Sequence, residues 1–279
     1  SSYICHPQMV NNELSGPSVL TGIAKHLSQI DNYYSYRFVL IPETIGSIMY
    51  ISQNFKILKK NVVGGYNITC VGDERSWGLV PSRYGNNQSD KIAEQVLSSC
   101  YPEFIKYTWL DRGSDERQYC SPGVDLPISS ITRSKYGNYP EYHTSLDNFD
   151  LVTEKGLNKS MDIYLKCVEV FENKKFSREE KNSRVNQEIH SKKIKEKDKY
   201  SSDKIFPEIN VLCEPQLGKR GLYPNISKKQ EKKQFKNFMN FISYCDGRNT
   251  IEEISNLCNI SYSESLDYYK KLKKIDLIY

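Results

Sequence analysis

Residues 3–27 read YICHPQMVNNELSGPSVLTGIAKHL, and the order of apolar and polar segments in this stretch indicates the fold class. A short apolar run comes first, and a polar loop that begins at His6 follows it. Val19, Ile23 and Leu27 then recur at the spacing of one helical face. The stretch therefore predicts a strand, a loop at its carboxyl end and a helix, which is the repeating unit of an α/β sheet.

The same alternation continues over the first three fifths of the chain. Apolar runs at residues 36–41 and 67–71 predict two further buried strands. Helical spacing of apolar residues predicts helices over 18–28, 89–97 and 154–171. We therefore expect one α/β domain over residues 1–172, built on an open and mostly parallel sheet.

Residues 173–204 have a different composition. They hold eleven Lys and Arg against six Asp and Glu, so this segment carries the whole net charge of +5. Basic residues alternate with acidic ones and no aromatic ladder accompanies them, which favours a solvated helix or linker over a nucleic-acid patch. The charge balance therefore gives little support to nucleic acid as a partner.

Residues 205–279 are predicted to form a second, smaller domain after a turn-rich connector. Aromatic and apolar residues between 235 and 242 lie on one helical face. Two residue pairs, each three positions apart, fit helix capping boxes in front of stretches with helical spacing of apolar residues. They are Thr250 with Glu253 and Ser261 with Glu264. Three short helices in this order predict a helix-turn-helix.

Common signatures and targeting segments are absent. The sequence has no P-loop, GxGxxG, HExxH or GxSxG motif, which excludes the function classes that depend on them. The eight cysteines form no CxxC pair, and we find no signal peptide, so we expect free thiols in a reducing cytoplasm. No apolar stretch approaches the ~18 residues of a membrane span, so we expect no membrane partner. Because the chain begins at Ser1 within a predicted strand, we expect a further portion to precede it.

Side chains that can ligate metals or move protons follow the predicted strands or lie in polar loops. These are His6, Glu43, Asp73 and His143. Ligands in open α/β sheets bind outside the carboxyl ends of the strands, where such residues gather. Imidazole and carboxylate suit zinc, which needs about three protein ligands and an open position for water. The pattern is compatible with a metal site and a general base, although a single His or Asp at a strand end is more often a cap or a turn residue.

Five blocks of sequence carry a more specific signal: HPQMVNNELSGP, IPETIGS, NITCVGDER, LDRGSDERQYCSPGVDLP and YPEYHTSLDN. In this order they resemble a bacterial aminopeptidase-like family related to the co-catalytic zinc aminopeptidases, whose members are often labelled polysaccharide biosynthesis proteins. The resemblance covers nearly the whole chain apart from the lysine-rich segment. It implies an α/β fold with an open mixed sheet flanked by helices, plus a small C-terminal winged-helix domain.

The resemblance also implies roles for individual residues. In the wider zinc aminopeptidases one ligand position matches His6, the bridging Asp position matches Asn12, and the general base matches Glu43. Further ligand positions match Thr44, Asp73 and His143, and His143 is alternatively expected to steady an oxyanion. The charged residues Asp115, Glu116 and Arg117 are expected to bind the charged end of a substrate or, alternatively, to form a surface turn.

Two positions depart from the family pattern. Asn12 is neutral and Thr44 has no carboxylate, so two anionic zinc ligands are missing. We therefore expect one zinc ion rather than two, with Glu13 replacing the lost ligand. A site with two ions and a site with none stay open.

The leading hypothesis is a metal-dependent, aminopeptidase-like hydrolase of peptide or amide bonds, linked to surface polysaccharide biosynthesis. The alternative is a catalytically degenerate binding protein, and whether the chain is an enzyme stays open. A DNA-binding regulator is the third hypothesis. Acidic Glu264 and Asp267 occupy the start of the helix that would read DNA, whereas lysines come at its end, so we expect a protein partner or a homo-oligomer instead.

Overall fold

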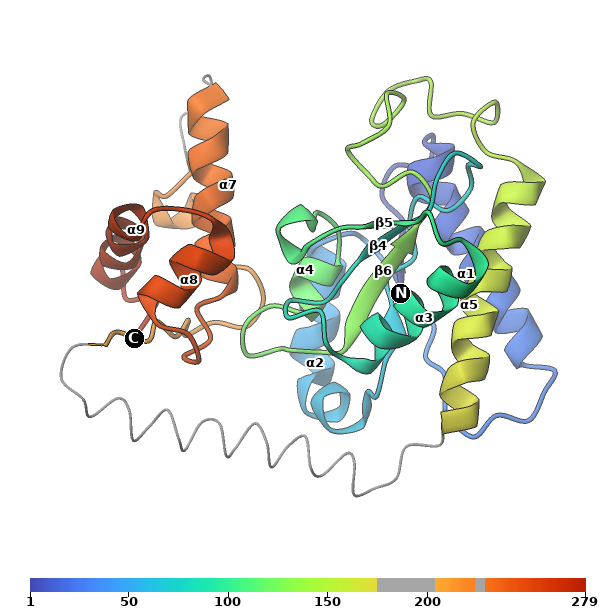
Figure 1. Ribbon diagram of the computed structural model, residues 1–279, viewed down its shortest axis with the longest axis horizontal. Coiled ribbons are helices and arrows are strands. Elements are labelled where there is room, and N and C mark those ends of the chain that lie inside the picture. Colours follow the sequence, from blue (N-terminus) through green and yellow to red (C-terminus); the bar gives the residue numbers. More distant parts are fainter. Residues whose placement is uncertain (175–203, 224–228) are drawn as a thin grey trace. The chain divides into compact units, whose positions relative to one another are not determined.

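The computed structural model describes residues 1–174, 204–223 and 229–279 (Figure 1). The described chain divides into two compact units. The first unit contains Ser1–Cys120 and the chain from Leu126 onward to residue 174, and the second contains Ser121–Asp125 and the described residues from Lys204 onward. The predicted charged segment 173–204 lies outside the described residues except at its ends, so the predicted domain boundaries stay predictions.

The strands of the first unit form two small sheets. In the first sheet β1 (Ser2–Tyr3) pairs in parallel with β2 (Leu40–Ile41). The second sheet has the order β3 (Gly65–Tyr66), β6 (Ile128–Thr132), β4 (Gly78–Val80), β5 (Ile105–Lys106). The β3–β6 and β4–β5 pairs are parallel and the β4–β6 pair is antiparallel, so the fold is mixed α/β.

Two predicted strands are shorter than expected. Only Leu40 and Ile41 of the run 36–41 pair with β1, and the Leu40 side chain is 47% exposed rather than buried. The run 67–71 follows β3 without continuing its ladder, although Asn67 N donates to Ser129 O at 2.9 Å. Cys70 has a positive φ of 53°, which a regular strand does not allow, so tertiary contacts end the strand early.

The helices predicted in the first unit are confirmed. They are α1 (Ser15–Leu27), α3 (Gln88–Cys100) and α5 (Glu154–Lys174), joined by α2 (Ile45–Asn61), the short α4 (Glu116–Tyr119), a π-helical turn η1 (Val10–Leu14) and a 3₁₀ turn η2 (Trp109–Asp111). Helices α1 and α5 lie side by side (Figure 1). A Cβ on Gly16 would lie 2.4 Å from both Ile68 O and Ser2 Oγ, so only glycine allows α1 to begin this close to the strands.

The second unit contains η3 (Gly218–Arg220), α7 (Lys229–Ser243), α8 (Ile251–Cys258) and α9 (Tyr262–Lys274). The capping box of Thr250 and Glu253 is confirmed, and Ser261 Oγ accepts a hydrogen bond from Glu264 N. Asn259, with a φ of 53°, makes the left-handed turn between α8 and α9. Because this turn separates two helices with a shared buried face, the predicted helix-turn-helix is confirmed.

No helix in the described part of the chain is long and apolar enough to span a membrane. The cytoplasmic location stays a prediction.

Candidate functional site

The loop after β1 holds His6 against a buried carboxylate. His6 Nδ1 lies 2.7 Å from Glu13 Oε1, while Cys5 N donates to Glu13 Oε2 at 2.7 Å. Asn12 Nδ2 also donates to Glu13 Oε1, at 3.3 Å, so both oxygens of the buried Glu13 are engaged. Hydrogen bonding to the carboxylate favours the tautomer with a proton on Nδ1. The Nε2 atom of the half-exposed His6 ring then has a free lone pair and no hydrogen bond to the described residues.

Asn12 is fixed by its backbone and presents an unsatisfied oxygen. The backbone N–H groups of Asn11 and Asn12 donate to the Asp147 carboxylate at 2.6 and 3.1 Å. Asn12 Nδ2 donates to Tyr3 OH at 3.1 Å. Its Oδ1 is buried and accepts no hydrogen bond from any described residue. A buried acceptor without a partner is costly unless a ligand or ion satisfies it.

Asp147 was missed by sequence reasoning. Its carboxylate accepts the two amides at the start of η1 and also the Tyr139 hydroxyl, at 2.9 Å. The side chain is 1% exposed. Its presence in the YPEYHTSLDN block was the one available signal, but nothing in that block indicates which distant backbone it would bind.

The structure brings His143 close to His6, although 137 positions separate them in the sequence. The two ring centroids lie 5.3 Å apart, and the His143 ring stacks on Tyr142 at 3.9 Å. His143 adopts a φ of 57°, a left-handed conformation in which histidine is enriched relative to most residues. The loop after β6 therefore reaches the loop after β1 and places two imidazoles together.

The Asp73 side chain connects its own loop to the chain at Asn11 and at Ser134 through hydrogen bonds. Its carboxylate accepts four hydrogen bonds, from Arg75 N at 2.9 Å, Ser134 Oγ at 2.9 Å, Ser134 N at 2.9 Å and Asn11 Nδ2 at 3.1 Å. These donors occupy both oxygens of a side chain that is 1% exposed. Among the described residues, no three His, Cys, Asp or Glu side chains are grouped closely enough to hold a metal ion. The metal-ligand roles of Asp73 and Glu13 stay predictions.

Glu43 lies on a strained turn that contacts the loop of His6. The Glu43 amide lies 2.8 Å from Cys5 Sγ, and the next residue, Thr44, has a φ of 62° and a ψ of −66°. Burial, followed by the neighbouring negative charge of Asp115, raises the pKa of the Glu43 carboxyl to about 7, against the opposing effect of Arg117. A carboxyl with this pKa exchanges protons near neutral pH, as a general base requires.

The charged residues that begin α4 surround the Glu43 turn. Asp115 Oδ1 accepts from Thr44 N at 2.7 Å, and Arg117 Nη2 donates to Thr44 Oγ1 at 2.5 Å. Asp115 and Glu116 are both completely buried. Glu116 accepts from Ser114 N at 3.0 Å and from the Tyr136 hydroxyl at 2.5 Å, among other donors. Contact of these three residues with a substrate stays a prediction.

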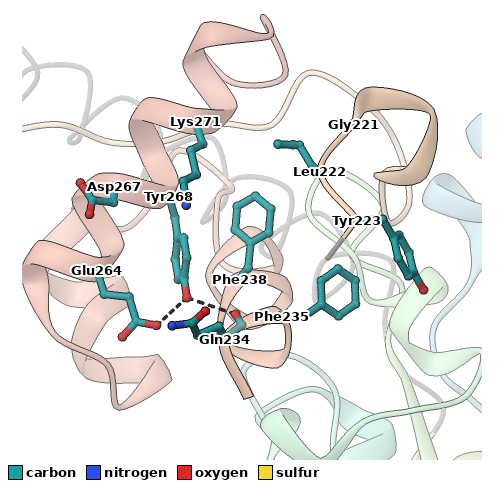
Figure 2. A pocket seen from close by; sticks show the side chains of 10 residues that line it. All are labelled: Gly221, Leu222, Tyr223, Gln234, Phe235, Phe238, Glu264, Asp267, Tyr268 and Lys271. Atoms are coloured by element: carbon teal, nitrogen blue, oxygen red, sulfur yellow. Dashed lines mark hydrogen bonds between the residues drawn. The ribbon is translucent and has the colours of Figure 1, made fainter. Parts of the chain in front are cut away.

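The second unit contains a cavity of about 420 Å³ that sequence reasoning did not find. Figure 2 shows its aromatic lining and polar rim. The lining residues are Gly221, Leu222, Tyr223, Gln234, Phe235, Phe238, Glu264, Asp267, Tyr268 and Lys271. The Tyr268 hydroxyl is bonded to Glu264 Oε1 at 2.5 Å and to Gln234 O at 3.1 Å, so the polar atom of the cavity floor is satisfied internally.

Comparisons with known proteins divide the chain in the same order. Residues 1–174 match a family described as a domain of unknown function (DUF4910), and residues 204–279 match a winged helix-turn-helix. A relative from Clostridium acetobutylicum, named a polysaccharide biosynthesis protein with an aminopeptidase-like domain, is 35% identical over 280 residues. The alignment covers 100% of this chain and 56% of that relative, so the chain spans about half its length.

Solved structures give the same fold. A Clostridium acetobutylicum crystal structure whose name describes a peptidase matches with a TM-score of 0.59 at 33% identity, over 100% of this chain and 56% of that one. An aminopeptidase from Aneurinibacillus sp. strain AM-1 matches with a TM-score of 0.52 at 18% identity, over 60% of this chain and 42% of that one. A Bacillus subtilis zinc aminopeptidase matches with a TM-score of 0.50 at 18% identity, over 60% of this chain and 45% of that one. The expected aminopeptidase-like fold with a C-terminal winged helix is confirmed.

Proposed function

The chain belongs to the family described as a domain of unknown function (DUF4910), and on that premise we propose that it is an aminopeptidase-like hydrolase of peptide or amide bonds. The observation that carries the proposal is the position of Glu43, on a turn held 2.8 Å from Cys5 and next to the loop of His6. The relative's name supports a role in polysaccharide biosynthesis, with a peptide or amide of that metabolism as substrate.

Glu43 is proposed as the general base. A carboxyl with a pKa of about 7 is about half ionised at neutral pH, so it can accept a proton from water and return it to a leaving amine. Proton transfer by a positioned side chain contributes about 10²–10⁴-fold to a rate. His143, whose ring stacks on Tyr142, is the candidate for steadying developing negative charge in the alternative case that it does not bind the metal.

The donor atoms left unengaged support the proposal of one metal ion rather than two. Two imidazoles that share a tetrahedral zinc ion with bonds of about 2.0–2.1 Å place their ring centroids roughly 5 Å apart. The ring centroids of His6 and His143 are separated by 5.3 Å, and we propose the unbonded Asn12 Oδ1, in the loop that follows His6, as a third donor. The carboxylates of Glu13 and Asp73 are already occupied by protein donors, which leaves a second ion without anionic ligands.

We accordingly assign His6, His143 and Asn12 as the residues that would hold a single zinc ion. Such an ion would polarise the substrate carbonyl and acidify a bound water. Glu13 would not bind the ion itself but would support His6. A carboxylate that accepts a hydrogen bond from Nδ1 orients a metal-binding histidine and increases its basicity. Asp73 would keep Asn11 and the loop at Ser134 in register with this site.

A second candidate function is ligand binding without catalysis. The specific observation in its favour is that the Asp73 carboxylate already accepts four hydrogen bonds within the chain, so it is not available to a metal ion. The side chains at Asn12 and Thr44 are also neutral. In that case the same loops would bind a peptide or an amide and release it unchanged.

For the second unit we propose a protein partner or self-association rather than sequence-specific DNA binding. Helix α9 begins with acidic Glu264 and Asp267, and its basic residues Lys271, Lys273 and Lys274 come in the last turn. Phosphates would be repelled from the end of a recognition helix that reads bases.

Zinc content and amide hydrolysis together test the proposal. The full chain would be equilibrated with zinc, assayed for bound metal and tested on a panel of aminoacyl amides, with Glu43→Gln as the variant and the exposed Glu103→Gln as the matched control. We expect about one zinc per chain in all three proteins and a loss of hydrolysis of roughly 10²-fold or more in Glu43→Gln alone. Equal hydrolysis by Glu43→Gln would overturn the assignment of the base, and substrate binding without hydrolysis would establish the second candidate.

A further inference from the structure

Thr44 carries the least favourable backbone conformation near the site. It is a β-branched residue at a φ of 62° and a ψ of −66°, outside the regions that such residues normally adopt. A conformation of this kind persists only when surrounding contacts enforce it. Thr44 also precedes the first residue of α2 without making a side-chain cap to that helix. The first residues of α2 bond only to backbone oxygens of the turn, such as Glu43 O and Thr44 O, so the Thr44 amide and hydroxyl are held from elsewhere.

The enforcing contacts come from the start of α4. Asp115 Oδ1 accepts from Thr44 N at 2.7 Å and from Ser47 Oγ at 2.8 Å. Arg117 Nη2 donates to Thr44 Oγ1 at 2.5 Å. Three hydrogen bonds therefore connect the beginning of α4 to the beginning of α2, on both sides of the strained peptide. Because Glu43 is the preceding residue, the same bonds fix the direction in which its side chain leaves the backbone.

Asp115 also acts on Glu43 through its charge. Its side chain is completely buried, and its Oδ2 atom accepts no hydrogen bond within the described part of the chain. A buried carboxylate oxygen without donors is poorly screened, so its field extends to neighbouring groups. The pKa of Glu43 is raised by this neighbour after burial itself, and Arg117 opposes the effect. The titratable and charged groups that face Glu43 are Tyr3, Cys5, Asp115, Glu116, Arg117 and Tyr142.

We propose that Asp115 is the positioning residue of Glu43, holding the Glu43–Thr44 turn through the Thr44 amide and the Ser47 hydroxyl. Arg117 has the complementary role: it donates a hydrogen bond to Thr44 Oγ1, and its positive charge opposes the effect of Asp115 on Glu43. This role differs from the substrate contact expected from the sequence, because it needs only contacts of the completely buried Asp115 within the chain. The inference rests on the proposed function only in naming Glu43 as the base, since the geometry of the turn is independent of any reaction.

The test follows the ionisation of Glu43 in the full chain by carbon NMR of labelled glutamate carboxyls, with Glu43→Gln identifying its signal. Asp115→Asn keeps an acceptor for the Thr44 amide and removes the charge, so the pKa of Glu43 should fall from about 7 towards its ordinary value. Arg117→Gln should move the pKa upward. The exposed Asp31→Asn, which also removes one carboxylate, should leave it unchanged.

Hydrogen exchange at the Thr44 amide tests the geometric part. Asp115→Ala removes the acceptor, so exchange should accelerate by about tenfold or more, whereas Asp115→Asn should largely restore the wild-type rate. Opposite pKa shifts in Asp115→Asn and Arg117→Gln are not expected from a general loss of structure. Shifts of the same sign, or an unchanged Thr44 exchange rate in Asp115→Ala, would overturn the proposal. Absence of hydrolysis in the wild type would defeat the proposed function and leave this result standing.

Discussion

His6 Nδ1 and Glu13 Oε1 lie 2.7 Å apart, and this contact determines which atom of the imidazole faces the site. Glu13 is 2% exposed and its second oxygen is held by the Cys5 amide, so it cannot easily turn away. The half-exposed His6 ring is therefore oriented by a rigid partner. Its Nε2 atom carries the lone pair that is available to a ligand. This relationship is the basis for assigning His6 to the metal and Glu13 to its support.

The first prediction concerns Glu13. Replacing it by Gln keeps an acceptor of similar shape but removes the charge that fixes the His6 tautomer. We expect the zinc affinity of the full chain to fall roughly 10–100-fold, as for other carboxylates behind a metal-binding histidine. A competition titration with a coloured chelator measures this. Glu103→Gln is the matched control, and an unchanged affinity in Glu13→Gln would remove Glu13 from the account.

The second prediction concerns stability and pH. The pKa of Glu43 rises from its ordinary value of 4.5 in the unfolded chain to about 7 in the folded one. A raised carboxyl pKa means that the folded state binds more protons between these values, so the ionised Glu43 reduces stability as pH rises from about 4.5 to 7. Glu43→Gln should therefore be more stable than the wild type at pH 8, on the order of 1–2 kcal/mol after allowance for partial exposure.

Urea unfolding measures this difference, because both tryptophans, Trp77 and Trp109, are buried in the first unit and report on it. The gain of Glu43→Gln should shrink towards zero near pH 4.5. A difference that is independent of pH would show that Glu43 titrates normally in the folded state.

The third prediction concerns Gly16. Alanine is the better helix former by about 1 kcal/mol, but its Cβ would lie 2.4 Å from Ile68 O and Ser2 Oγ. We expect Gly16→Ala to lower the free energy of unfolding of the first unit by about 1–3 kcal/mol. Ser18→Ala, on the exposed face of the same helix, is the control and should change stability by less than about 0.5 kcal/mol. A neutral Gly16→Ala would mean that α1 does not begin against these strands.

The fourth prediction concerns the second unit. Thr250 Oγ1 accepts from Glu253 N at 3.1 Å, and Glu253 Oε2 accepts from Thr250 N at 2.6 Å. Removing the cap in Thr250→Ala should destabilise α8 by about 0.5–2 kcal/mol. Hydrogen exchange of the α8 amides measures the change, with the exposed Asn256→Ala on the same helix for comparison. Equal protection in the two variants would contradict the capping role.

The helices that the sequence predicted could be recognised because the patterns that indicate them span only a few residues. The spacing of Val19, Ile23 and Leu27 and the pair Thr250 and Glu253 each act within a few residues. The strand predicted at 67–71 is not formed, because Cys70 adopts a positive φ that a regular strand does not allow and that no local pattern indicates. Strand-end position alone singled out His6 and His143, but their 5.3 Å separation depends on how two distant loops fold.

The remaining features of the site depend on long-range contacts that the sequence does not encode in any short pattern. The strained Thr44 depends on Asp115, which is 71 positions away, and the start of η1 depends on Asp147. Thr44, Asp115 and Asp147 all lie within the blocks that carry the motif resemblance, but the blocks do not show which contacts these residues make. The expected contact of Asp115 with a substrate stays a prediction, and a charged residue in a loop does not reveal that it will be buried in the folded chain.

The pH dependence of kcat/KM for an aminoacyl amide is the most direct test of Glu43 as the base. The base acts in its ionised form, so kcat/KM should rise with pH through a midpoint near 7, the pKa of Glu43. In Asp115→Asn the same midpoint should lie at lower pH. A profile that is flat between pH 5 and 8, or a midpoint that Asp115→Asn does not move, would contradict the account.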